Sequence, residues 1–141
     1  MKELPYSIHI PAWNSLVVHA GIIPSIALDK QTPTDLVTLR NIVFHEDGTR
    51  VEGTSRNDIG EPWVNHWQGD ATALLGAAFS NEPLHIVFGH DARRGLQQGA
   101  HFTGLDTGCA YGRQLSALIL PERRLVQVPA REVYSPVDGK D

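Results

Sequence analysis

Two short apolar segments of the sequence each end in a histidine with a glycine close by. The segment NSLVV (14–18) runs into His19-Ala20-Gly21, and LHIVF (84–88) runs into Gly89-His90-Asp91. Apolar runs of this length bounded by glycine are typical of short β-strands. In open α/β sheets the ligand crevice lies beyond the carboxyl ends of strands, and a glycine lets the backbone turn a side chain toward it. The pattern therefore favours an α/β fold in which His19 and His90 meet.

Imidazoles at such strand ends are candidate metal ligands, because a catalytic site that keeps an open coordination position can activate water. The alternative is that each histidine is a satisfied, partly buried residue near a turn. The carboxylates nearest in sequence, Asp91 and Asp106, lie in no obvious ligand cluster, and Asp106 is expected to shape the turn LDTG. No HExxH, Walker, GxSxG or CxxC motif occurs.

Several arginines are candidates for phosphate recognition. Arg93 and Arg94 directly follow the second histidine motif and would place fixed cations beside the crevice. They could equally be solvated loop charges. Arg40 has the same two interpretations: a phosphate contact, or a favourable charge near a helix C-terminus.

Composition indicates a soluble globular protein with one domain, residues 1–141, since 41% of the residues are hydrophobic and no linker or repeat divides the chain. A net charge of -4 argues against nucleic-acid coating. No apolar run approaches the ~18 residues of a membrane span, and MKELPYSIHI lacks a signal-peptide core. The single Cys109 fits a buried role in a reducing compartment, so we expect a cytoplasmic location.

Local signals predict further elements. Thr32 and Pro33 can cap and begin a helix over 32–42, with Leu36, Leu39 and Val43 on its buried face. Residues 46–60 are expected to form a surface loop with a hairpin near Asp47-Gly48. The other expected elements are a strand over 6–10, a turn of helix bringing Trp63 and Trp67 to one face, a helix over 71–79, a turn or short helix over 94–99, and a hairpin of 114–120 with 124–128.

Five blocks of the sequence, taken in order, resemble one known family. They are VVHAGIIP (17–24), LRNIV (39–43), PWVNHW (62–67), VFGHDARRGLQ (87–97) and GLDTGCAYGRQLSALIL (104–120). The chain resembles the C-terminal half of calcineurin-like metallophosphoesterases, and most of all bacterial diadenosine tetraphosphate hydrolases and their eukaryotic relatives. The resemblance implies the C-terminal half of a two-sheet αββα sandwich.

The resemblance also implies a site. In that family two divalent metal ions activate a hydroxide that hydrolyses phosphate esters or phosphoanhydrides, and a histidine protonates the leaving oxygen. His19 and His90 match two ligands of the second metal; Arg40, and more weakly Arg94, match phosphate contacts. The metal would be manganese, iron, zinc or cobalt, and the substrate a phosphorylated small molecule, polyphosphate or phosphoprotein.

The chain departs from the family because the blocks GDxHG, GDxxxxG and GNH, which should precede LPYSIHIP, are absent. With them go both first-metal ligands, the bridging Asp, the Asn, the general acid and further phosphate arginines. We therefore expect this chain alone to be inactive, with an exposed apolar face and unpaired strand edges that drive self-association. The alternative is a stand-alone, non-catalytic binding or interaction module derived from the same fold.

Overall fold

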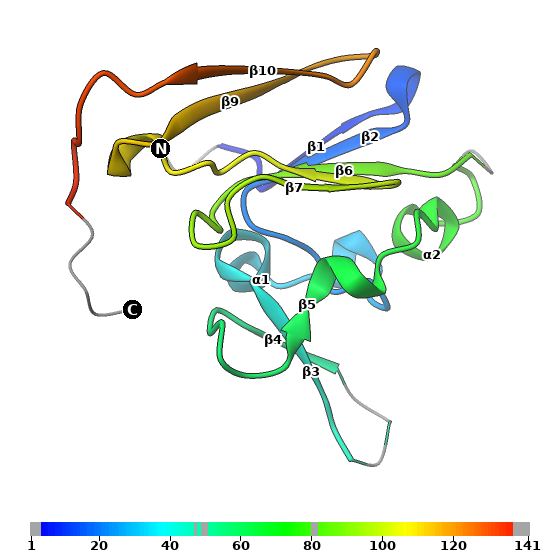
Figure 1. The fold of residues 1–141 in the computed structure, drawn as a ribbon. Helices are drawn as coiled ribbons and strands as arrows, with labels where there is room; N and C mark the ends of the chain where they lie inside the picture. Colours follow the sequence, from blue (N-terminus) through cyan, green and yellow to red (C-terminus); the bar gives the residue numbers. More distant parts are fainter. Residues whose placement is uncertain (1–3, 47, 49–50, 80–81, 137–141) are drawn as a thin grey trace.

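The chain folds into a mixed α/β structure with three separate sheets (Figure 1). It is seen in a computed structural model that describes residues 4–46, 48, 51–79 and 82–136. The largest sheet has five strands in the order β1-β2-β6-β8-β7. Their bounds are Ser7–Ile10 (β1), Ser15–Val18 (β2), His85–Phe88 (β6), Phe102–Gly104 (β8) and Gln97–Gly99 (β7).

The middle of the large sheet is parallel, and its rim is antiparallel. β2, β6 and β8 run in the same direction, whereas β1 and β7 pair antiparallel with β2 and β8. β6 is buried along its whole length because it lies between two parallel neighbours. The two apolar segments of the sequence are therefore adjacent central strands, as expected.

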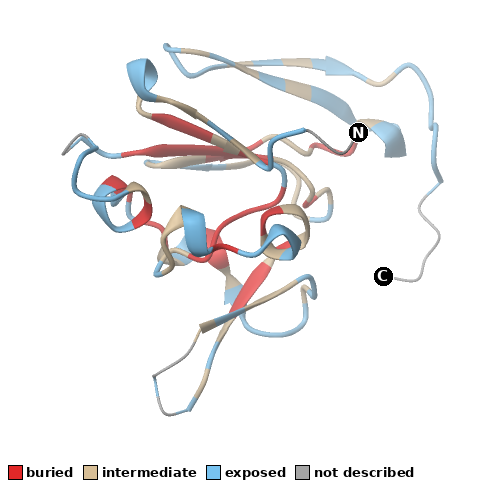
Figure 2. Cartoon of the chain, turned by 180° about the vertical axis from the view of Figure 1, so that it is seen from behind, coloured by how far each residue is buried: buried red, intermediate tan, exposed pale blue. Residues whose placement is uncertain are grey.

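Both α-helices and a small sheet lie on one side of the large sheet, and a hairpin lies on the other (Figures 1 and 2). The small sheet has the order β4-β3-β5, with bounds Asn41–Phe44 (β3), Val51–Thr54 (β4) and Glu61–Pro62 (β5). The helices are α1 (Pro33–Thr38), α2 (Ala71–Leu75) and four 3₁₀ segments: η1 (Pro11–Trp13), η2 (Leu28–Lys30), η3 (Trp63–His66) and η4 (Cys109–Tyr111).

One hydrophobic core joins the large sheet to this helical layer. Leu16 and Ile86 are fully buried in the central strands and pack with Leu39, Trp63 and Trp67. The expected placement of both tryptophans on one buried face is confirmed. Figure 2 shows the buried residues concentrated in the central strands and on the inner sides of the helices.

The first helix is shorter than predicted. Thr32 caps it as expected, its hydroxyl accepting a hydrogen bond from the Asp35 amide at 3.0 Å. The helix ends at Thr38, however, and residues 41–44 form β3, so Val43 lies on a strand. The Arg40 N–H already donates to the Thr54 carbonyl at 2.9 Å. Pairing with β4 and β5 therefore replaces the last turns of the expected helix.

Other element boundaries also differ from prediction. α2 stops at Leu75 because Gly76 has a φ of +93°, a left-handed conformation that ends a helix. Within the predicted turn or short helix at 94–99, residues 97–99 form strand β7. A hairpin joins β3 and β4 as expected, although Asp47 lies outside the described residues. Cys109 is only partly buried.

The C-terminal hairpin is confirmed and forms a sheet of its own. β9 (Gln114–Ile119) pairs antiparallel with β10 (Arg124–Pro129). Its outer face carries exposed apolar side chains, among them Leu115 (57% exposed) and Val128 (51%). Among the described residues, β1 is a sheet edge that pairs only with β2. Exposed apolar surface and an open strand edge are thus both present, as expected.

None of the helices in the described ranges is long and apolar enough to cross a bilayer.

Candidate metal centre

His19 and His90 lie side by side at the carboxyl ends of two adjacent parallel strands. The register pairs Leu16 with Ile86 and Val17 with Val87, so the next residues of β2 and β6 end together. The centroids of the two imidazole rings are 5.2 Å apart, with an interplanar angle of 53°. The predicted meeting of the two histidines is therefore confirmed, while their role as metal ligands stays a prediction.

The backbone at His90 is in a strained turn. His90 has a φ of +67°, which few residues other than glycine adopt. The Asp91 N–H donates to the Gly89 carbonyl at 2.8 Å, so the turn spans only three residues, as in a γ-turn. Such strain persists where the surrounding structure fixes it, and it is concentrated at functional sites. Here it directs the His90 side chain to its neighbour His19.

The electrostatic environment favours the neutral form of His90. Its pKa is lowered, chiefly by burial and further by the nearby charges of Arg40 and His19. Neutral imidazole is the form that binds metal ions, so the environment suits a ligand. His19 is exposed beside it, and its ring is open to a shared ligand.

The described residues supply only part of a metal site. Two neighbouring imidazoles fit the nitrogen ligands that divalent transition metals prefer. Within residues 4–46, 48, 51–79 and 82–136, however, no group of three or more His, Cys, Asp or Glu side chains is placed to hold an ion. A tightly bound metal here needs ligands beyond these two.

A groove of about 720 Å³ lies beside His19. It runs along the open edge strand β1 and is lined mainly by apolar side chains. Tyr6 (54% exposed), Ile8 (53%) and the partly buried Val17 and Val37 contribute to it. The candidate metal ligand therefore borders an apolar surface and an unpaired strand edge.

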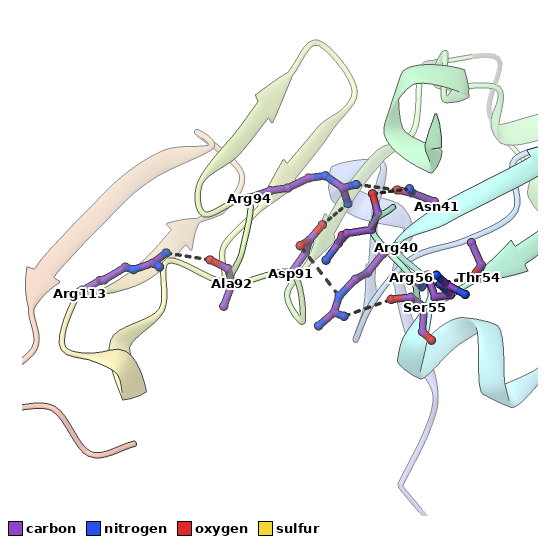
Figure 3. A network of polar contacts seen from close by, with 10 residues as sticks. Arg40, Asn41, Thr54, Ser55, Arg56, Asp91, Ala92, Arg94 and Arg113 are labelled. Atoms are coloured by element: carbon purple, nitrogen blue, oxygen red, sulfur yellow. Dashed lines mark hydrogen bonds and ion pairs between the residues drawn. The ribbon is translucent and has the colours of Figure 1, made fainter. Parts of the chain in front are cut away.

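Asp91 organises the arginines next to the histidine pair (Figure 3). Its side chain is 7% exposed and forms an ion pair with Arg94 through Oδ2, while its Oδ1 lies 4.0 Å from Nε of Arg40. Arg40 Nη1 also donates to the Ser55 carbonyl at 3.1 Å. The buried carboxylate, one residue after His90, thus holds the Arg94 guanidinium directly and lies close to that of Arg40.

The two arginines differ in how many of their donors are already used. Arg94 binds Asp91 through Nη1 and donates to the side-chain oxygen of Asn41 through Nη2 at 2.6 Å. Arg40 is the more exposed of the two (30% against 23% for the side chain), and its buried Nε has no hydrogen-bond partner among the described residues. Arg94 therefore has the more polar contacts within the cluster, whereas Arg40 keeps slightly more of its side chain exposed; a phosphate contact by either stays a prediction.

Sequence reasoning named Asp91 without its role in this cluster, and it did not single out Asn41. The Asn41 side chain is buried and donates to the carbonyl of Ile59 at 2.7 Å while it accepts from Arg94, so it joins the small sheet to the loop after His90. An amide at the start of an apolar strand, in LRNIV, was the available signal. Asp106 was interpreted correctly, since its carboxylate accepts from the Gly108 amide at 3.2 Å within the LDTG turn.

Comparisons with known proteins point to one class. No family model matches the chain. It is 28% identical over 135 residues to the asymmetrical bis(5'-nucleosyl)-tetraphosphatase PrpE of Oceanobacillus iheyensis. This match covers 94% of this chain and 46% of the relative. It is 44% identical over 54 residues to the symmetrical bis(5'-nucleosyl)-tetraphosphatase of Methylobacillus flagellatus, which covers 38% of this chain and 18% of the relative.

The fold comparison agrees. A crystal structure of a protein provisionally described as a diadenosine tetraphosphatase matches with a TM-score of 0.76 and 36% identity, covering 92% of this chain and 52% of that one. The chain therefore has the fold of that protein. More particularly, it resembles diadenosine tetraphosphatases, and it spans about half the length of the relatives matched over most of this chain.

Proposed function

We propose that this chain forms half of a metal-dependent phosphoanhydride hydrolase that acts on dinucleoside polyphosphates. The observation that supports the proposal most strongly is the His19–His90 pair, whose rings lie 5.2 Å apart at the ends of two parallel strands. The relatives are bis(5'-nucleosyl)-tetraphosphatases, and their activity supplies the substrate class of the proposal.

In this proposal the two histidines hold one divalent ion, whether manganese, iron, zinc or cobalt. A bound ion there supplies charge stabilisation for phosphoryl oxygens. The strained turn at His90 orients its ring, burial keeps it neutral, and Asp91 positions the guanidinium groups. Arg40 binds a phosphate oxygen of the substrate, and Arg94 links Asp91 to Asn41 and so positions the cluster.

The remaining ligands come from a second polypeptide segment, in the same protein or in a companion chain. The apolar groove beside His19 and the open edge of β1 provide a surface on which such a segment would pack. A carboxylate arriving beside His19 would complete the ligand set. This chain alone is therefore expected to be inactive.

The test is to join this chain to the part of the Oceanobacillus relative that lies outside the match. The fusion should hydrolyse bis(5'-adenosyl) tetraphosphate with added manganese, and His90→Ala should remove the activity, whereas His9→Ala, a histidine outside the site, should not. Efficient metal-dependent turnover by the chain alone would contradict the half-site proposal.

The second candidate is a binding module without catalysis. It is favoured because, in the described ranges, no group of three or more His, Cys, Asp or Glu side chains is placed to hold an ion. A fusion that folds and binds nucleotide but shows no turnover would favour this candidate over the hydrolase.

A further inference from the structure

A second cavity lies between the end of β3, the segment η3 and the start of α2. It has a volume of about 340 Å³. Its lining includes Ile42 and Trp67, which are apolar and buried (2% and 3% exposed). The volume is at the lower end of the range for ligand pockets, so the cavity suits one small ring system rather than an extended ligand.

Two aromatic rings form one wall of this pocket. The rings of Phe44 and His66 lie with centroids 4.9 Å apart at an angle of 57°, and His66 Nε2 is 2.9 Å from a carboxylate oxygen of Glu61. Phe44 is 50% exposed, although it ends a strand whose first two residues, Asn41 and Ile42, are buried. An exposed ring beside a second ring held by a polar contact is a stacking platform for a flat ligand.

The polar groups at this pocket suit a neutral ligand. The described residues that line it include no Lys or Arg, and they include the acidic Asp70. A phosphate would be repelled there. The amide of exposed Gln68 and the hydroxyl of Ser25 offer both hydrogen-bond donors and acceptors, which suits the polar edge of a heterocyclic base.

One strand connects this pocket to the arginine cluster. β3 begins at Asn41, whose side chain binds Arg94, and ends at Phe44 in the aromatic wall. These positions are ~10 Å apart at the usual rise of an antiparallel strand, and their side chains leave opposite faces of β3, so the two sites are joined around the strand rather than along one face. We propose that the pocket is a nucleobase subsite for one base of a dinucleoside polyphosphate whose phosphates lie toward the arginine cluster. The identity of this ligand rests on the proposed function.

Adenosine tests the pocket separately from hydrolysis, because it carries no phosphate and needs no metal. Calorimetric titration gives the affinity, and the indole N–H signal of Trp67 in a ¹H–¹⁵N spectrum reports the location. Phe44→Ala should weaken adenosine binding by about tenfold or more, as expected for loss of a stacking partner. Phe79→Ala is the matched control, since Phe79 is a partly exposed ring outside this pocket. Ribose is the control ligand and should not bind.

A second variant keeps the proposal testable if Phe44→Ala fails to fold. Ala73→Trp fills the pocket from the exposed side of α2 and should also abolish adenosine binding. The proposal is overturned if adenosine does not bind the unmodified chain, or if it binds both pocket variants as tightly. The two proposals can fail separately. If adenosine binds in a Phe44-dependent way but the fusion described above does not hydrolyse the tetraphosphate, the subsite is supported and the proposed hydrolase is refuted.

Discussion

The amide N–H of Gly89 donates a hydrogen bond to the carbonyl oxygen of His19 at 2.8 Å. This bond extends the pairing of β2 and β6 beyond the last strand residues, so the two candidate ligands are held together by backbone rather than by their side chains. The positive φ of His90 follows directly after it. The backbone therefore arranges the two histidines before any ligand binds, and it does so with a strained conformation at His90.

The positive φ of His90 predicts that glycine is the more stable replacement at this position. His90→Gly and His90→Ala both remove the imidazole, but glycine adopts a φ of +67° without the Cβ clash. The glycine variant should be more stable than the alanine variant by about 1 kcal/mol, measured by urea unfolding. His19 is the control, because it is not among the residues with positive φ: there glycine should be the less stable variant. Equal stability of the two His90 variants would contradict the strain.

Asp91 should matter for stability far more than an exposed carboxylate. Asp91→Ala leaves two partly buried guanidinium groups without their anion and should lower the free energy of unfolding by about 2 kcal/mol. Asp58→Ala removes an exposed partner of Arg56 and should change stability little. Chemical denaturation of both variants makes the comparison, and similar losses in the two would contradict a positioning role for Asp91.

The buried His85 predicts acid sensitivity. Burial, with a smaller contribution from Arg123, lowers its pKa to about 4, from an ordinary value of 6.5. Between these values the unfolded chain binds more protons than the folded chain, so stability is complete above pH 6.5 and falls as the pH drops toward 4. The slope from this group is at most about 1.4 kcal/mol per pH unit. Urea unfolding of the native chain and of His85→Gln at several pH values between 4 and 6.5 measures this contribution. The free energy of unfolding of the native chain should fall more steeply as the pH drops, and curves that run parallel for the two proteins would refute the prediction.

The open edge of β1 predicts self-association. Ile8 and Tyr6 are more than half exposed beside an unpaired strand edge, and edges of this kind pair with other chains. The chain should elute above its monomer mass in size-exclusion chromatography, and Ile8→Lys should reduce the association. Ile59→Lys changes an exposed isoleucine elsewhere (39% exposed) and should not. A monomeric chain with one cooperative melt would contradict the prediction.

The sequence could predict the histidine pair because its signals are local. Each strand ends in a histidine with a glycine nearby, which indicated that His19 and His90 could meet, and the parallel pairing of β2 and β6 brings them together. The cap at Thr32 and the C-terminal hairpin are local in the same way.

The parts that sequence could not predict depend on distant partners. The helix that begins at Pro33 gives way to β3 because β4 and β5 supply strand partners that lie beyond any local window. The same holds for the arginine cluster, in which Arg94 binds an asparagine 53 positions away. The role of Asp91 appears only once these segments are brought together, since its second partner, Arg40, is equally remote in sequence.

The central claim is that His19 and His90 bind the same divalent ion. Titration with diamagnetic Zn²⁺, followed through the imidazole nitrogen signals of the histidines in ¹H–¹⁵N spectra, tests it most directly because direct coordination shifts the signal of the ligating nitrogen itself. The His19 and His90 ring signals should shift together at the same Zn²⁺ concentration, the His9 signal should not, and His19→Ala should remove the effect at His90. A coordination shift at only one of the two rings, or persistence of the shift at His90 in His19→Ala, would contradict the shared site.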